Sequence, residues 1–127
     1  MPFRKFVQGY KDCYKNYFQS DSRGQSPEPL VIACSDSRTA PAIITGSQPG
    51  EMFVVRNVAA IVPPYRHDTN HHGTSAAIEF AVKTLKVKHI VILGHSMCGG
   101  IQALAHRDTT EQEYEFLAQW MDIATPA

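Results

Sequence analysis

Three short, uninterrupted apolar runs constrain the fold of this 127-residue chain more than any other feature of the sequence. They cover residues 30–33 (LVIA), 52–55 (MFVV) and 89–93 (HIVIL). Such runs are typical of strands covered on both faces, as in parallel sheets. Between the second and third runs, Ser75–Leu85 carries apolar residues at helical spacing, and a strand–helix–strand order indicates a right-handed βαβ unit. We therefore predict an α/β fold with a parallel-core sheet flanked by helices.

Three further segments are predicted to be helical. The segment 99–106 follows the third strand, and 111–123 carries apolar residues at helical spacing. Residues 3–18 form an amphipathic pattern, which predicts a stripe that packs on the body or on another subunit. This stripe consists of Phe3, Phe6, Val7, Tyr10, Tyr14, Tyr17 and Phe18. The segment Ser20–Pro29 is rich in Ser, Asp, Gly, Gln and Pro, which favours a loop.

Length and composition point to one ordinary globular domain, comprising an N-terminal helix over about 1–19 and an α/β core over about 28–127. Twelve basic residues balance twelve acidic ones, so we expect no nucleic-acid or membrane partner. No apolar run approaches the ~18–20 residues that span a bilayer, and the N-terminus lacks a secretory apolar core. We expect a cytoplasmic protein, or an organellar one if a transit segment is removed. Three cysteines, an odd number, argue against a disulfide framework.

Two of the predicted strands run directly into residues suited to chemistry. The first is followed by Cys34-Ser35-Asp36-Ser37-Arg38, and the third by Gly94-His95-Ser96-Met97-Cys98-Gly99-Gly100. In open parallel sheets, ligands bind outside the carboxyl ends of the strands. We therefore expect these two segments to share a site.

Cys34, His95 and Cys98 are the candidate metal ligands, because thiolate sulfur and imidazole nitrogen are preferred donors for zinc. Three protein ligands leave the fourth tetrahedral position open, which is typical of catalytic zinc. The alternative is that both cysteines are small buried side chains and His95 is a hydrogen-bonded core histidine. Asp36 and Arg38 are expected to form a charge-assisted pair, and a purely structural salt bridge is the alternative.

Three blocks together resemble the signatures of β-class carbonic anhydrases. They are 34–38 (CSDSR), 50–59 (GEMFVVRNVA) and 94–100 (GHSMCGG). The segments 24–27 (GQSP) and 62–65 (VPPY) look like the plant-type branch of that family. The resemblance runs from about residue 24 to residue 104 and continues more loosely beyond.

The resemblance implies a lyase, carbonate dehydratase, which hydrates carbon dioxide reversibly to bicarbonate and a proton. One Zn²⁺ per chain, held by Cys34, His95 and Cys98, would lower the pKa of its water, and the zinc-bound hydroxide would attack CO2. Asp36 would accept a hydrogen bond from the hydroxide, and Arg38 would hold Asp36 in place. In another state of the family, Asp36 becomes the fourth zinc ligand.

The same resemblance implies a substrate pocket. The amide of Gln25 would donate a hydrogen bond to the substrate oxygen, and Gly99 would offer its backbone N–H. Phe53, Val58 and Phe80 would form an apolar lining. In the family, Gln25 and Phe53 reach the zinc of a neighbouring subunit, which implies a homodimer or a higher even oligomer.

Family catalytic domains continue past the position of Ala127 with a further strand and helices. We therefore expect an apparent C-terminal truncation to leave an unprotected sheet edge and exposed apolar surface, and with them altered oligomerisation or a need for a partner segment. Two other functions stay open: hydrolysis of a related small substrate such as CS2, and an inactive zinc-containing fragment with an assembly role.

Overall fold

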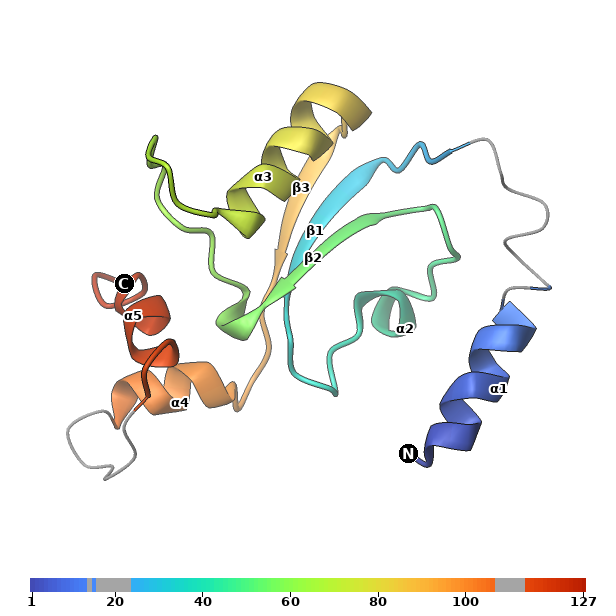
Figure 1. Cartoon of the computed structure of the whole chain (residues 1–127), viewed down its shortest axis with the longest axis horizontal. Helices are drawn as coiled ribbons and strands as arrows, with labels where there is room; N and C mark the ends of the chain where they lie inside the picture. The colour runs from blue at the N-terminus through green and yellow to red at the C-terminus, as the bar shows by residue number, and fades with distance from the viewer. Residues whose placement is uncertain (14, 16–23, 107–113) are drawn as a thin grey trace.

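A computed structural model describes residues 1–13, 15, 24–106 and 114–127 of the chain. Its centre is a three-stranded sheet in the order β2-β1-β3, with both strand pairs parallel (Figure 1). The strands are β1 (Pro29–Cys34), β2 (Phe53–Asn57) and β3 (His89–Leu93). All three lie at the predicted apolar runs, which confirms the predicted parallel α/β fold.

β1 is the centre of the sheet and of the core. In register, Leu30 faces Phe53 on one side and Ile90 on the other. α3 (Gly73–Phe80) continues into the π-helical segment η3 (Ala81–Leu85). The main apolar cluster consists of Leu30, Ile32 and Ala81, with Phe53, Val55, Ile78 and Val87 packed against it. The βαβ unit therefore buries its crossover helix against the central strand, as its apolar periodicity predicts.

β3 corrects one part of the prediction, because this strand is not covered on both faces. Its consecutive residues Ile90, Val91 and Ile92 are all exposed, Ile90 at 53% and Ile92 at 54%. Within the part of the chain that the structure describes, β3 is an edge strand, and the main core cluster is built on β1 instead. An apolar run shows that a strand can be buried, but the partners that bury it are set by the rest of the fold. Within the described residues β3 is thus an exposed apolar edge, and altered oligomerisation stays a prediction.

Helices gather at the carboxyl end of the sheet. α4 (Gly99–Ala105) packs against α5 (Leu117–Asp122), and α4 also contacts the short turn η2 (Val58–Ala60) that follows β2 (Figure 1). α4 matches the predicted helix 99–106. The helix predicted over 111–123 begins later, at Leu117, in the residues described from 114 onward; residues 111–113 lie outside them.

A short helix was not predicted. α2 (Pro41–Thr45) begins with proline, whose fixed φ suits a first helical turn, and ends at Gly46 with φ 68°. The sequence signal is this Pro-to-Gly asymmetry, but a single turn between two strands lacks the periodicity by which longer helices are predicted.

α1 (Phe3–Cys13) realises the first part of the predicted helix over 3–18 and stands apart from the sheet (Figure 1). None of its residues is buried, and Phe3, Phe6 and Tyr10 are exposed. The described aromatic members of the stripe are therefore not buried against the body. Its remaining members, Tyr14, Tyr17 and Phe18, lie outside the described residues, as does 20–23 of the predicted loop. In the described ranges, no helix has the length and apolar character that crossing a membrane requires.

Candidate metal centre

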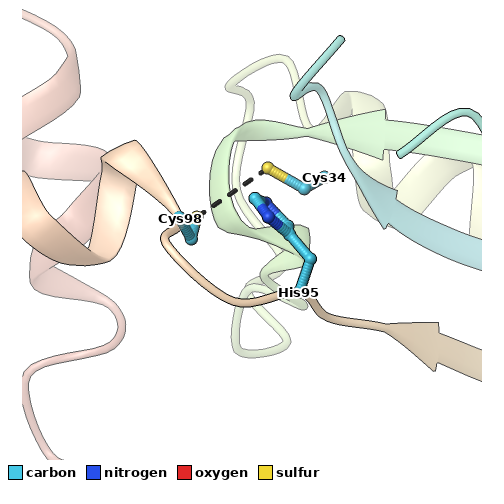
Figure 2. Close-up of side chains that lie close together, drawn as sticks. All are labelled: Cys34, His95 and Cys98. Carbon is cyan, nitrogen blue, oxygen red and sulfur yellow. Dashed lines mark hydrogen bonds between the residues drawn. The ribbon is translucent and has the colours of Figure 1, made fainter. Parts of the chain in front are cut away.

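The three predicted ligands come together at the carboxyl edge of the sheet. Cys34 ends β1, and His95 and Cys98 lie on the loop that joins β3 to α4 (Figure 2). Their ligand atoms all lie within 4.8 Å of one another, and the two sulfur atoms are 3.9 Å apart. That separation is far too long for a disulfide. Two sulfurs on one tetrahedral zinc lie roughly 3.8 Å apart, since each Zn–S bond is about 2.3 Å. The group therefore fits a shared metal ion.

The His95 ring offers an unused nitrogen to this group. Its Nδ1 lies 2.8 Å from the carbonyl oxygen of Ser96, which assigns the ring proton to Nδ1 as the donor. Its Nε2 is buried and has no hydrogen-bond partner among the described residues. Buried polar atoms almost always have a partner, and Figure 2 shows the ring directed between the two cysteines. A metal ion is the partner that fits this donor set, because a neutral imidazole binds metal through its free nitrogen.

The surroundings also favour a thiolate at Cys34. Burial alone raises the pKa of this thiol, but the backbone N–H of Asp36 at 3.5 Å, the nearby His95 ring, the backbone of Ala59 and the Cys98 sulfur together outweigh it. The net effect lowers the pKa of Cys34 to about 7. The interaction with Cys34 in turn raises the pKa of His95. Metal binding to sulfur requires the thiolate, so Cys34 is prepared for that role near neutral pH.

Asp36 is clamped by Arg38 beside the ligands. The backbone N–H and Nε–H of Arg38 both donate to Oδ1 at 2.9 Å, and Nη2 donates to Oδ2 at 2.7 Å. These hydrogen bonds hold the pKa of Asp36 well below its usual range, so the carboxylate stays ionised. Oδ2 lies 4.0 Å from Nε2 of His95. The predicted charge-assisted pair is therefore present, and its carboxylate faces the candidate metal group.

Arg38 also links the two loops of the site. Its Nη2 donates to the carbonyl oxygen of Met97 at 3.2 Å. Met97 has φ 55°, a left-handed conformation that is unfavourable for a residue with a side chain. Strained backbone of this kind persists where surrounding contacts hold it, and it clusters at functional sites.

Sequence reasoning assigned no role to Arg56, which supports the ligand loop from β2. Its Nε donates to the carbonyl oxygen of Cys34 at 2.9 Å, and its Nη2 donates to that of Asp36 at 2.7 Å. The buried Thr39 adds a hydroxyl hydrogen bond to the Asp36 carbonyl at 3.0 Å. The sequence signal that could have indicated this role is a basic residue at the end of the second apolar run. The structure pairs that strand with β1 and places Arg56 beside Ala33 in register.

The predicted pocket residues divide into two groups. Val58 follows β2 directly at the carboxyl edge, and Gly99 follows Cys98. Gln25, Phe53 and Phe80 are not brought to the metal group within one chain. Gln25 is exposed in the segment before β1, and Phe53 begins β2, where it contacts Phe80 with ring centroids 5.8 Å apart. These three lie at the amino-terminal end of the sheet, whereas the ligands lie at its carboxyl end.

The fold and the ligand group define an α/β protein with a Cys/His/Cys set at the carboxyl edge of a parallel sheet, and comparisons with known proteins identify its family. The sequence model of a family described as carbonic anhydrase matches residues 29–127. Beta carbonic anhydrase 5, chloroplastic, of Arabidopsis thaliana is 42% identical over 118 residues, covering 93% of this chain and 38% of that protein. The chain therefore belongs to the β-carbonic anhydrase family.

Solved structures agree with this assignment. The β-carbonic anhydrase CcaA superposes with a TM-score of 0.81 at 35% identity, over 98% of this chain and 55% of CcaA. One of two tetrameric β-carbonic anhydrases from Sordaria macrospora gives a TM-score of 0.70 at 43% identity, over 93% of this chain and 56% of its own. A carbon disulfide hydrolase at 14% identity shares the fold alone. The chain thus spans only about two-fifths to just over half of the length of these three family members.

Proposed function

We propose that this chain hydrates carbon dioxide reversibly to bicarbonate and a proton at a zinc site formed by Cys34, His95 and Cys98, with one Zn²⁺ per chain. The observation that carries the proposal is the convergence of two thiols and an unpartnered buried imidazole nitrogen beside a carboxylate held by Arg38. In this proposal the α/β core over about 28–127 supplies these residues, and α1 (Phe3–Cys13) is a separate element of the same domain.

Zinc held by the thiolates of Cys34 and Cys98 and the imidazole of His95 would supply Lewis-acid activation of water near neutral pH. The chain's own residues then determine geometry. Asp36, ionised and without a proton of its own, can only accept a hydrogen bond, so it orients a proton-bearing nucleophile beside His95. Arg38 fixes both carboxylate oxygens of Asp36 and thereby the direction of that acceptor. Asp36 as a fourth metal ligand is the alternative state, and it requires that Arg38 release the carboxylate.

The substrate side of the site combines residues from two copies in this proposal. Val58 and Gly99 adjoin the ligands in the same chain, and they supply an apolar wall and a backbone N–H. Gln25, Phe53 and Phe80 lie at the opposite end of the sheet, so they contribute only from a neighbouring copy. We therefore propose a homodimer or a higher even oligomer. The tetrameric relatives from Sordaria macrospora support this assembly.

An inactive zinc-containing fragment is the main rival function. In this chain three hydrogen bonds from Arg38 hold the ionised carboxylate of Asp36 beside the three ligands. A purely structural zinc site does not require such a carboxylate, so this feature favours catalysis. Hydrolysis of CS2 has no specific observation in its favour. For location we propose the cytoplasm, with an organelle as the alternative because the Arabidopsis relative is named as chloroplastic. Both suit the three free cysteines.

Stopped-flow CO2 hydration by the purified, zinc-loaded chain tests the proposal. We expect turnover in the unaltered chain and in C13A, and loss of turnover in C98A. Cys13 is the matched control, since it lies on α1 away from the metal group. An unaltered chain that hydrates CO2 no faster than C98A, while holding one zinc per chain by elemental analysis, would favour the inactive-fragment function.

A further inference from the structure

The turn η2 has a strained backbone and lies directly against the candidate metal ligands. Ala59 has φ 68° and Ala60 has φ 53°, so two consecutive residues with side chains adopt the left-handed region. Ala60 is buried in one cluster with Cys34 and Cys98, and Ala59 packs on that cluster. A shift of this turn would therefore move a wall of the cluster that contains both cysteine ligands.

Two sets of hydrogen bonds hold the turn in this conformation. Asn57 and Ile61 bracket it: the Asn57 amide donates to the Ile61 carbonyl at 2.8 Å, and the Ile61 N–H donates back to the Asn57 side chain at 2.8 Å. The second hold comes from α5, where the indole Nε1–H of Trp120 donates to the Val58 carbonyl at 2.8 Å. Trp120 lies 62 positions further along the chain, so this bond ties a distant helix to the metal-site turn.

Gly100 shows how closely α4, α5 and the turn approach one another. A Cβ atom at this position would lie 2.6 Å from Cγ1 of Val58, a distance that real Cβ atoms essentially never show. It would also lie 3.2 Å from Cβ of Ala59 and 3.2 Å from Sδ of the buried Met121. Glycine is therefore required here for close approach, two residues after the ligand Cys98. The turn is therefore confined by α4 and held by Trp120 of α5.

We propose that Trp120 is a positioning residue for the metal centre. Its hydrogen bond to the Val58 carbonyl holds the strained turn 58–60 against Cys34 and Cys98. Gly100 lets α4 approach this turn closely, because it has no side chain. This inference rests on the proposed zinc site. Trp120 acts through the turn and touches neither the ligands' metal-binding atoms nor the substrate in this scheme. Groups that orient ligands from outside the ligand set typically change metal affinity by 10–100-fold.

The test measures zinc affinity by competition with a chromophoric chelator at fixed pH, together with the absorption spectrum of the Co²⁺-substituted chain. W120F keeps an apolar ring and removes only the Nε1–H donor, whereas W120H retains a ring N–H. F116L is the matched control, because Phe116 is an exposed aromatic residue at the start of the same helix. We expect W120F to bind zinc about 10-fold more weakly and to shift the sulfur-to-cobalt charge-transfer band. We expect W120H to recover part of the affinity and F116L to match the unaltered chain.

A second pair of variants tests the same contact from α4. G100A should also weaken zinc binding and shift the cobalt band, whereas G73A should not, because a Cβ at Gly73 meets nothing within 4 Å. Circular dichroism confirms that each variant is folded before its affinity is compared. If the unaltered chain binds zinc but W120F and G100A match F116L and G73A in affinity and spectrum, this inference alone is wrong. If the unaltered chain binds no zinc, the proposed function is overturned and this inference with it.

Discussion

At the scale of single residues, the candidate site depends on side chains that hold other side chains. Arg38 holds both carboxylate oxygens of Asp36, whose Oδ2 lies 4.0 Å from Nε2 of His95, and Arg56 holds the carbonyls on either side of Ser35. A planar guanidinium can make this two-point contact, whereas an ammonium group carries the same charge without the fork. Orientation as well as charge therefore distinguishes Arg38 from a lysine at that position.

Replacing Arg38 should separate these two contributions. In R38Q we expect CO2 hydration to fall roughly 100-fold, since positioned proton-accepting groups contribute about 10²–10⁴-fold. R38K should recover only part of this loss. Because Arg38 lowers the pKa of Asp36, its removal should raise that pKa toward the usual 3.8, which NMR titration of the carboxyl group can follow. R66Q is the control, an exposed arginine outside the ligand group. Equal activity in R38Q and R66Q would contradict the role of Arg38.

At the scale of secondary structure, two strands with nearly the same composition have opposite environments. Ile32 and Ile92 are partners in register on β1 and β3, yet Ile32 is fully buried and Ile92 is 54% exposed. The difference comes from position in the sheet: β1 has a strand on each side and α3–η3 packed over it, whereas β3 is at the edge of the described sheet. The stability of the described fold should therefore depend mainly on β1.

This pair gives a direct test of the core. I32A should lower the free energy of unfolding by about 2–5 kcal/mol, because it removes buried methyl groups and leaves a cavity. I92A makes the same chemical change at an exposed position and should cost less than about 1 kcal/mol. Urea unfolding followed by circular dichroism measures both. Equal losses would show that β3 is as well covered as β1 in solution, through assembly or another contact.

At the scale of the whole molecule, one chain does not complete the proposed site. The metal group occupies the carboxyl end of the sheet, whereas Gln25 and the Phe53–Phe80 pair occupy the other end. A residue at one end of a strand cannot reach the other end of the same sheet without unfolding it. The proposed catalytic unit therefore requires at least two copies related by symmetry.

Mixing two inactive variants tests whether the site is shared between subunits. C98A lacks a ligand but keeps Gln25, and Q25A keeps the ligands but lacks the amide. In a mixed dimer, the metal group of the Q25A copy meets Gln25 of the C98A copy, so one site in two is complete. Random pairing should restore about a quarter of the unaltered activity after co-refolding. Light scattering should show an even oligomer. Activity no higher than the average of the two variants alone would contradict a shared site.

Local patterns in the sequence determined the strands, the order strand–helix–strand and the three residues of the candidate metal group. The apolar runs at 30–33, 52–55 and 89–93 predict parallel strands because each is short and continuous, and the chemistry-bearing residues follow two of them directly. Parallel strands place their carboxyl ends at one edge, so the meeting of Cys34 with His95 and Cys98 follows from order along the chain. Each of these features rests on a local pattern, a strand and the residues that follow it, so the sequence alone is enough to predict it.

Tertiary structure alone decided which surfaces are covered and which distant groups hold the site. The exposure of β3, the separation of Gln25 and Phe53 from the ligands within one chain, and the bond from Trp120 to the Val58 carbonyl all depend on packing between segments far apart in sequence. The left-handed turn at Ala59 and Ala60 has no sequence signal, because alanine disfavours that conformation and only surrounding contacts maintain it. Apolar periodicity shows which face of a segment can be buried, whereas tertiary packing determines which residues contact that face.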